Sequence, residues 1–348
     1  MKFGVALDHQ YERGDDIGRR IGELIELTEF ARDIGFSSVY GIHHYLAPLK
    51  TLQPLTLLAR LVPSSGDMTL GTGIFLAGLP HPVHIAEEVA SLDQLSGGRV
   101  ALGVGAGYRD EEFDSFGIER SSRGRRLVES IEVMRRLWTG EEVDHDGEFV
   151  QLRGCRISMP PARPGGPPIY VGATNPTTIR RAARIGDSWL STFSHKIRWA
   201  AGHLEIFQDE LRNLGRDVSG REYPIQRELY LADSYEQAVA EAEPHLRRSY
   251  SSYADYDMDY LRDLFPDLCD KAFLLGTPDQ IHDRLLEHEA AGFNHFIFRV
   301  QWLGSTHEVA KRTLRRFADE VMPRLAQAPE TSDGRAAAAS GSSGGGTP

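Results

Sequence analysis

The chain has 348 residues, of which 41% are hydrophobic and 26% are charged, and its formal net charge is -11 at pH 7. This length suits one large domain, and the acidic balance argues against nucleic acid or an anionic membrane as the main partner, because either would favour a basic face. The two cysteines, Cys155 and Cys269, lie far apart without metal-ligand spacing, so we expect neither a disulfide framework nor a metal site.

The beginning of the chain predicts neither an export signal nor a membrane anchor. The apolar stretch after Met1 is only KFGVAL, which is too short for the core of a signal peptide, and polar residues follow it. No apolar run reaches the roughly 18 residues that a membrane span needs. We therefore expect a cytoplasmic protein.

The first half of the chain predicts alternating strands and helices. Short apolar runs predict strands at 3–7, 36–40, 68–76 and 100–104. Apolar residues at helical spacing predict helices from about 17 to 31, capped by Asp15 or Asp16, from about 55 to 61, and from 82 to 96. The run at 100–104 has no polar alternation, as expected for a parallel strand that is buried on both faces.

The second half continues the same alternation after one long interruption. An amphipathic helix is expected at 123–138, and a Pro- and Gly-rich insertion with one hairpin strand at EFVQL follows at 139–168. Further strands are expected at 168–172, 188–191, 225–231 and 296–300, with helices at 176–185, 195–214, twice within 235–270, after 278, and at 308–325. Eight strands with their helices predict a closed α/β barrel, a (β/α)8 TIM barrel, in preference to an open doubly wound sheet.

One stretch carries a specific family pattern. Residues 82–107 read P-V-x-x-A-E-x-x-A-x-L-D-x-L-S-x-G-R-x-x-L-G-V-G-x-G, and E-F-x-x-F-G follows at 112–117. This pattern resembles the bacterial luciferase-like flavin monooxygenase superfamily, and the likeness extends from residue 1 to about 326. The resemblance implies a TIM barrel that uses either reduced FMN with O2 or the deazaflavin F420. We assign the barrel domain to residues 1–327.

His43 and His44 are the candidate catalytic residues, because they follow the second strand and an imidazole can exchange a proton near neutral pH. A hydrogen-bonded pair that only closes the strand end is the structural alternative. The luciferase pattern has E-H-H-F here with a catalytic first histidine, whereas this chain has Ile42 in place of the carboxylate and Tyr45 at the end. The proton partner of His43 is therefore unassigned, and its titration is expected between about pH 6 and 7.

The flavin ring is expected on the third strand. The resemblance implies a non-proline cis peptide bond there, which corresponds to Gly73-Ile74, with Gly105 at the end of the next strand leaving room for the cofactor. Close packing of strands is the alternative reason for these glycines.

The flavin phosphate is expected at the turn after the fifth strand. The resemblance places it at Thr174 and Thr177, with Gly172 allowing a close approach, and the start of a helix favours an anion. Ordinary helix capping by Thr174 or Asn175 is the alternative, and the two roles are compatible.

A second group of phosphate contacts is expected after the fourth strand. Luciferase has a cysteine and an arginine there, whereas this chain has Gly105 and Ala106, so Tyr108 and Arg109 become the candidates. A surface ion pair of Arg109 with Asp110 or Glu112 is the alternative. Arg299, inside the eighth strand, needs a buried partner, which is either a substrate carboxylate or a structural aspartate.

These residues favour a flavin-dependent monooxygenase that uses reduced FMN and O2 to oxidise a small organic substrate. Because the chain carries no NAD(P)H fingerprint, the resemblance implies a separate flavin reductase, and a homodimer is compatible with this reading. An F420-dependent oxidoreductase that transfers hydride ranks second, since the chain has His43-His44 instead of the D-H-F pattern of that branch. A non-catalytic flavin-binding barrel is the third alternative.

Residues 328–348 consist mainly of glycine, serine and alanine, and they predict a disordered tail because they offer little apolar surface to bury. Deletion of residues 329–348 should leave the melting temperature and cofactor binding unchanged. Thermal melts of the full-length and truncated proteins check this expectation. A loss of more than a few degrees would show that the tail supports the fold.

Overall fold

The computed structural model describes residues 1–254 and 265–327, so the expected tail at 328–348 lies outside the described residues. None of the helices in these two ranges is long and apolar enough to cross a membrane.

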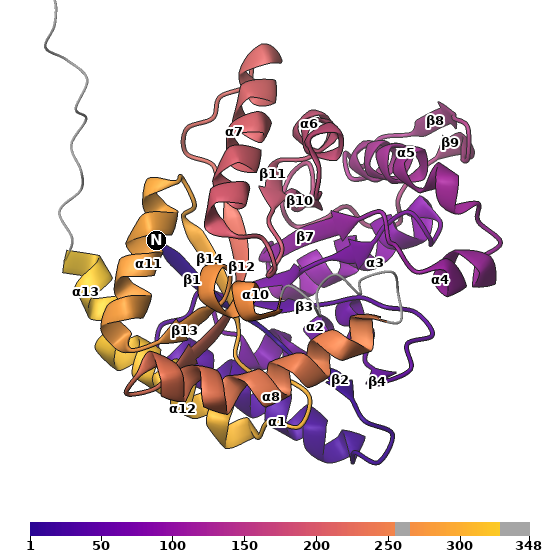
Figure 1. Ribbon diagram of the computed structural model, residues 1–348. Coiled ribbons are helices and arrows are strands. Elements are labelled where there is room, and N and C mark those ends of the chain that lie inside the picture. Colours follow the sequence, from indigo (N-terminus) through magenta and orange to yellow (C-terminus); the bar gives the residue numbers. More distant parts are fainter. Residues whose placement is uncertain (255–264, 328–348) are drawn as a thin grey trace, which may run out of the picture.

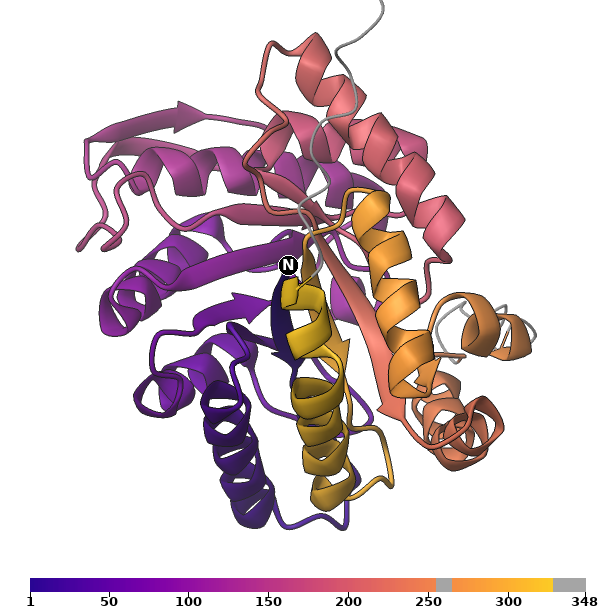
Figure 2. The same cartoon turned by 90° about the vertical axis from the view of Figure 1, so that its left-hand side faces the viewer.

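A barrel of eight parallel strands forms the centre of the described chain (Figures 1 and 2). The strands are β1 (Lys2–Ala6), β3 (Ser38–Gly41), β5 (Thr69–Thr72), β7 (Val100–Gly105), β10 (Ile169–Gly172), β11 (Ser188–Leu190), β12 (Pro224–Leu231) and β14 (His295–Arg299). They pair in the order β11-β10-β7-β5-β3-β1-β14-β12. A parallel bridge between Ser191 and Ile225 closes the ring between β11 and β12. The expected TIM barrel is confirmed.

Shorter strands depart from the expected pattern. The strand expected at 68–76 is two strands, β5 and β6 (Phe75–Leu76), because the extended backbone is interrupted at Gly73 and Ile74. The second strand, β6, pairs with β7. Three further strands were not predicted, because they are too short to show a periodic pattern. They are β2 (Gln10–Tyr11) and β4 (Lys50–Thr51), which form an antiparallel ribbon, and β13 (Leu274–Gly276), which pairs with residues Leu229–Leu231 at the end of β12.

Helices surround the barrel (Figure 1). They are α1 (Ile17–Asp33), α2 (Pro54–Leu61), α3 (Pro82–Ser96), α4 (Asp110–Ser115), α5 (Arg123–Leu137), α6 (Pro176–Ile185), α7 (Ile197–Asn213), α8 (Tyr235–Ala254), α10 (Phe265–Lys271), α11 (Pro278–Ala290), α12 (His307–Glu320) and α13 (Met322–Gln327). Asp16 caps α1 by accepting hydrogen bonds from two backbone N–H groups, and Gly97 ends α3 with a left-handed backbone. The single helix expected at 308–325 is split at Val321 into α12 and α13.

The insertion at 139–168 lies outside the ring of helices, beside α5 and α3 (Figure 1). It contains a hairpin of β8 (Val143–Asp146) and β9 (Gln151–Cys155). Glu129 on α5 accepts hydrogen bonds from the N–H groups of Phe149 and Val150, and Glu87 on α3 accepts one from Ser158. These contacts hold the insertion against α5 and α3.

The barrel interior is filled by side chains, and two of its strands approach each other closely at a glycine. An interior cluster contains Ala6, Tyr40, Ala101, Tyr170, Leu190 and Ile297. The backbones of β5 and β7 approach so closely that a Cβ atom at Gly103 would lie 1.9 Å from the carbonyl oxygen of Thr72. The Thr72 hydroxyl donates a 2.7 Å hydrogen bond to the Gly103 carbonyl, which ties the two strands together where β5 ends.

Gly103→Ala should therefore destabilise the protein by about 1 to 3 kcal/mol, because the backbone of β5 has to shift. Gly202→Ala is the matched control, since Gly202 lies inside α7 and nothing lies within 4 Å of an added Cβ atom. That control should gain about 0.5 to 1 kcal/mol from the better helix propensity of alanine. Urea unfolding measures both, and equal effects of the two substitutions would contradict the close approach.

Candidate active site

The candidate residues gather at the carboxyl end of the barrel, where the loops after β3, β5 and β7 meet. This is the end at which barrel enzymes hold their active sites. His43 and His44 follow β3, the Gly73-Ile74 bond follows β5, and Glu112 follows β7 on α4.

His43 is held by hydrogen bonds at both ring nitrogens. Nδ1 accepts a 3.1 Å hydrogen bond from the backbone N–H of Leu76, so Nε2 carries the proton and donates it to Gln53 Oε1 at 2.8 Å. The ring is 2% exposed and stacks on Phe75 at 4.3 Å between centroids. Burial lowers the pKa of His43 to about 3. The expected titration between pH 6 and 7 is therefore wrong for this residue.

His44 lies beside a buried carboxylate that its own strand does not supply. Its Nδ1 atom lies 3.1 Å from Glu112 Oε1, which also accepts a 2.9 Å hydrogen bond from the backbone N–H of Tyr45. Glu112 is fully buried, so its charge needs these partners. The carboxylate that is missing at Ile42 in the sequence thus reaches the histidine pair from the loop after β7. The E-F-x-x-F-G motif contains this glutamate, but sequence spacing alone did not connect it to His44.

Arg109 belongs to the same buried group. Its guanidinium lies 3.5 Å from Glu112 and donates a 2.9 Å hydrogen bond to the Tyr45 carbonyl. The ion pair considered as the alternative is therefore present, but it is buried and not at the surface. Tyr108 is partly buried, and its ring meets the ring of His44 edge to face at 5.9 Å. These contacts give both residues a role in holding the histidine loop.

The Gly73-Ile74 peptide bond is cis, as expected. Gln226 donates a 3.1 Å hydrogen bond to the Gly73 carbonyl from across the barrel. The Ile74 side chain is partly exposed and lies over two glycines: a Cβ atom at Gly105 would come within 2.8 Å of it and one at Gly172 within 3.1 Å. These glycines make room for the Ile74 side chain. The apolar surface at this place is therefore formed by the isoleucine and not by the glycine backbone.

The start of α6 lies close to Ile74, because Gly172 ends β10 two residues before Thr174. Asn175 caps the helix through a capping box with Thr178, so of the two capping candidates the asparagine is correct. Thr174 and Thr177 are both exposed. The Trp189 indole N–H donates to the Ala173 carbonyl at 2.9 Å and fixes the turn.

Arg299 meets a glutamate of the chain itself. Its guanidinium donates to both carboxylate oxygens of Glu228, which is fully buried. Tyr250 and Trp302 each donate a further hydrogen bond of 2.7 Å to the same carboxylate. The structural partner is therefore present, as Glu228 in place of the expected aspartate, and the Arg299 charge is compensated without a substrate.

The arrangement suits a flat cofactor with an anionic group. Ile74 offers a partly exposed apolar surface, the start of α6 offers exposed hydroxyls and the positive end of a helix, and His44 with Glu112 offers a group that can exchange protons. Glu112 Oε2 is buried without a hydrogen-bond partner among the described residues, which leaves an acceptor at this site. FMN and F420 both have the required flat ring and phosphate.

Comparisons with known proteins identify related sequences and a related fold. The model of the luciferase-like monooxygenase family matches residues 1–295. The oxygenase component of flavin-dependent trigonelline monooxygenase from Acinetobacter baylyi is 27% identical over 88% of this chain and 90% of its own. F420-dependent glucose-6-phosphate dehydrogenase from Amycolatopsis mediterranei is 26% identical over 87% and 94%. The crystal structure of monooxygenase RslO1 from Streptomyces bottropensis superposes with a TM-score of 0.84 at 25% identity, covering 93% of this chain and all of that one.

His43 should stay neutral down to about pH 5, with its proton on Nε2, because burial holds its pKa low. Nitrogen NMR of the imidazoles measures charge and tautomer together, and His43→Gln identifies the signal. Below pH 6.5 the unfolded chain takes up a proton at this residue that the folded chain does not, so the free energy of unfolding falls as the pH drops. That fall should be shallower in His43→Gln. A His43 signal that titrates between pH 6 and 7 would contradict the buried geometry.

Proposed function

The chain belongs to the luciferase-like monooxygenase family, and we propose that it is a monooxygenase that uses reduced FMN and O2 to oxidise a small organic substrate. The observation that carries the proposal is the His44–Glu112 pair at the carboxyl end of the barrel, beside the loop that contains Ile74. A flat ring against Ile74 would lie within the same group of loops as this pair.

Reduced FMN would supply the electrons that activate O2, and the residues of the chain would orient it and manage protons. Ile74 would support one face of the ring, and the hydroxyls of Thr174 and Thr177 would bind the phosphate. When the Nδ1–H group of His44 donates a hydrogen bond to Glu112, the ring would exchange protons with the reacting molecule through its other nitrogen, Nε2. His43 would keep the proton on its Nε2 atom, donate it in a hydrogen bond to Gln53, and so hold the loop after β3 in place.

The histidine roles thus differ from the luciferase pattern, in which the first histidine is catalytic. Both nitrogens of His43 are engaged, and its low pKa keeps the ring neutral at pH 7, so it has no imidazolium proton to donate. His44 has a carboxylate neighbour within hydrogen-bonding distance of Nδ1. We therefore assign the proton-exchanging role to His44 and a supporting role to His43.

A separate flavin reductase would supply reduced FMN. The relative from Acinetobacter baylyi is described as an oxygenase component, which supports this arrangement. The second candidate function is hydride transfer with F420, and it is supported by the F420-dependent relative from Amycolatopsis mediterranei at nearly the same identity. The same loops would hold either cofactor.

The two functions are separated by mixing the protein with reduced FMN and, in a second experiment, with reduced F420. Equilibrium titration gives the affinity for each cofactor, and an oxygen electrode follows O2 consumption. Tight binding of reduced FMN with altered O2 kinetics supports the monooxygenase. Binding of F420 alone, without any effect on O2 consumption, would favour the second function, and binding of neither would refute both.

The double variant Thr174→Ala with Thr177→Ala should weaken FMN binding by about 1 to 3 kcal/mol, because charge-assisted hydrogen bonds to the phosphate are lost. Riboflavin, which lacks the phosphate, should bind both proteins equally. Thr56→Ala is the control, since Thr56 is exposed on α2. Fluorescence titration measures each affinity, and unchanged FMN affinity in the double variant would move the phosphate to another loop.

His44→Asn should lower turnover by about 100- to 10,000-fold while the affinity for reduced flavin changes by only a few fold. Glu112→Gln should lower turnover by a smaller factor, because an amide replaces the carboxylate beside His44 Nδ1. His43→Gln should affect turnover less than His44→Asn does. Steady-state kinetics across pH test this order, and the reverse order would return the catalytic role to His43.

A further inference from the structure

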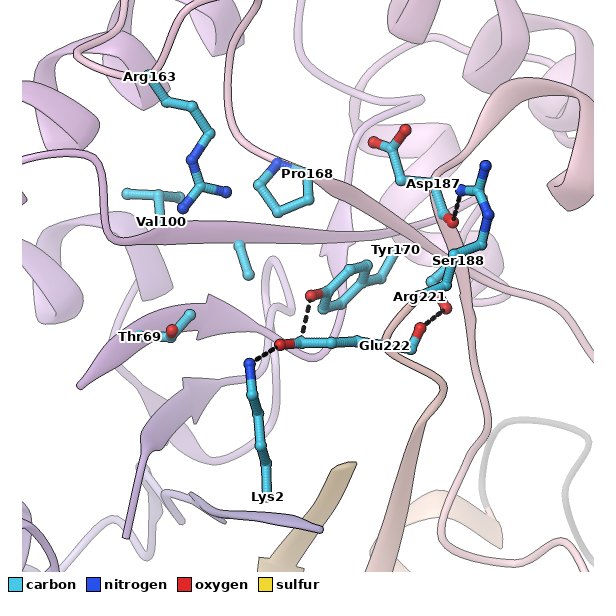
Figure 3. Close-up of a pocket in the computed structure, with 11 residues that line it drawn as sticks. Lys2, Thr69, Val100, Arg163, Pro168, Tyr170, Asp187, Ser188, Arg221 and Glu222 are labelled. Carbon is cyan, nitrogen blue, oxygen red and sulfur yellow. Dashed lines mark hydrogen bonds and ion pairs between the residues drawn. The ribbon is translucent and has the colours of Figure 1, made fainter. Parts of the chain in front are cut away.

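A polar cavity of about 320 Å³ lies at the amino end of the barrel, opposite the candidate active site (Figure 3). Its walls come from residues at or just before the starts of strands, among them Lys2, Thr69, Val100, Pro168 and Ser188. The proposed oxygenase reaction uses none of these residues.

Most charges in the cavity wall are compensated within the protein. Lys2 pairs with Glu222, whose carboxylate also accepts a 2.7 Å hydrogen bond from Tyr170 (Figure 3). The same carboxylate lies 3.3 Å from His295. The hydrogen bond from His295, with those from Lys2 and Tyr170, holds the pKa of Glu222 well below its usual range. Asp187 is paired with Arg135 at 2.9 Å.

Two arginines in the wall are not compensated in this way. Arg163 donates a 2.7 Å hydrogen bond to the backbone carbonyl of Gly98, and Arg221 donates one of 2.9 Å to the backbone carbonyl of Asp187. Within residues 1–254 and 265–327, neither guanidinium forms an ion pair with a carboxylate at 4 Å or less. A positive surplus therefore exists at this cavity, although the chain as a whole carries a net charge of -11.

A neighbouring arginine strengthens the surplus. The pKa of Arg216 is lowered by burial and by the charge of Arg221. Its nearest carboxylate is Asp187, at 4.0 Å, which Arg135 already engages. Arg135 and Arg216 therefore share the Asp187 carboxylate. The charge of Arg221 also acts on Asp217, and an added anion at this edge of the cavity would relieve the repulsion between the guanidinium groups.

The strand order sets the spacing of the two uncompensated arginines. Gly98, to which Arg163 is bound, precedes β7, and Asp187, to which Arg221 is bound, precedes β11, with β10 between them. Neighbouring strands lie about 4.8 Å apart, so the two anchoring carbonyls are about 10 Å apart. Pro168, just before the middle strand, and Tyr170, on that strand, lie between the arginines in Figure 3.

We propose that this cavity binds a short dicarboxylate, with one carboxylate at Arg163, the other at Arg221, and the connecting carbons against Pro168 and Tyr170. Paired guanidinium groups at fixed spacing select for two oxyanions and against one. The ligand would connect the starts of β7, β10 and β11, next to the seam where Ser188 on β11 donates a hydrogen bond to the carbonyl before β12. Binding therefore stabilises the closed barrel.

Succinate is the probe, with butyrate as the single-charge control, succinamide as the neutral control and inorganic phosphate as the compact oxyanion, all at equal ionic strength. The melting temperature of the full-length protein should rise with succinate concentration and should not respond to butyrate or succinamide. Calorimetric titration should give one succinate per chain. A response to phosphate equal to that of succinate, or no response to succinate, would overturn the two-ended site.

Variants locate the binding. Arg163→Gln and Arg221→Gln should each weaken succinate at least tenfold, whereas Arg60→Gln, at an exposed arginine of α2, should not change it. Because Arg163 is exposed, its variant should fold and decides the matter if Arg221→Gln does not. The Thr174→Ala and Thr177→Ala double variant should bind succinate normally. Succinate binding that fails in this double variant, but survives in Arg163→Gln, would place the anion at α6 and overturn the proposal.

Discussion

The buried carboxylate of Glu112 fixes the carboxyl end of the barrel in one arrangement. It accepts hydrogen bonds from the Tyr45 backbone and lies next to His44 and Arg109, so two loops from different strands share one charge. Removing one of these partners would weaken the compensation of a fully buried charge, which destabilises the fold. The loop after β3 therefore cannot move without the loop after β7, and the position of His44 follows from this coupling.

A steric constraint of the same kind shapes the surface beside the histidines. Ile74 occupies space that side chains at Gly105 and Gly172 would fill, and Gln226 holds the preceding carbonyl. Three strands thus cooperate to present one isoleucine side chain. The apolar surface of Ile74 and the His44–Glu112 pair come from adjacent loops, which fits the proposed function: one part would orient the ring and the other would manage protons.

Local sequence pattern was sufficient for the barrel and insufficient for several contacts. Eight apolar runs of strand length predicted the eight barrel strands, because parallel strands buried on both faces leave a strong signal. The two-residue strands of the β2/β4 ribbon leave none. The sequence also could not show that Glu228 meets Arg299 or that Glu112 meets His44, since both pairs join residues about 70 positions apart. The low pKa of His43 depends on burial, which only the folded chain reveals.

The central claim is that the flavin binds at the carboxyl end of the barrel, with its ring against Ile74 and its phosphate at the start of α6. Diffraction from crystals of the protein grown with FMN tests this most directly. We expect ring density on the Ile74 side chain, phosphate density within hydrogen-bonding distance of Thr174 and Thr177, and His44 facing the ring. Density for the cofactor at the amino end of the barrel, or a phosphate bound by Arg109 after the loop of His44 has moved, would contradict it.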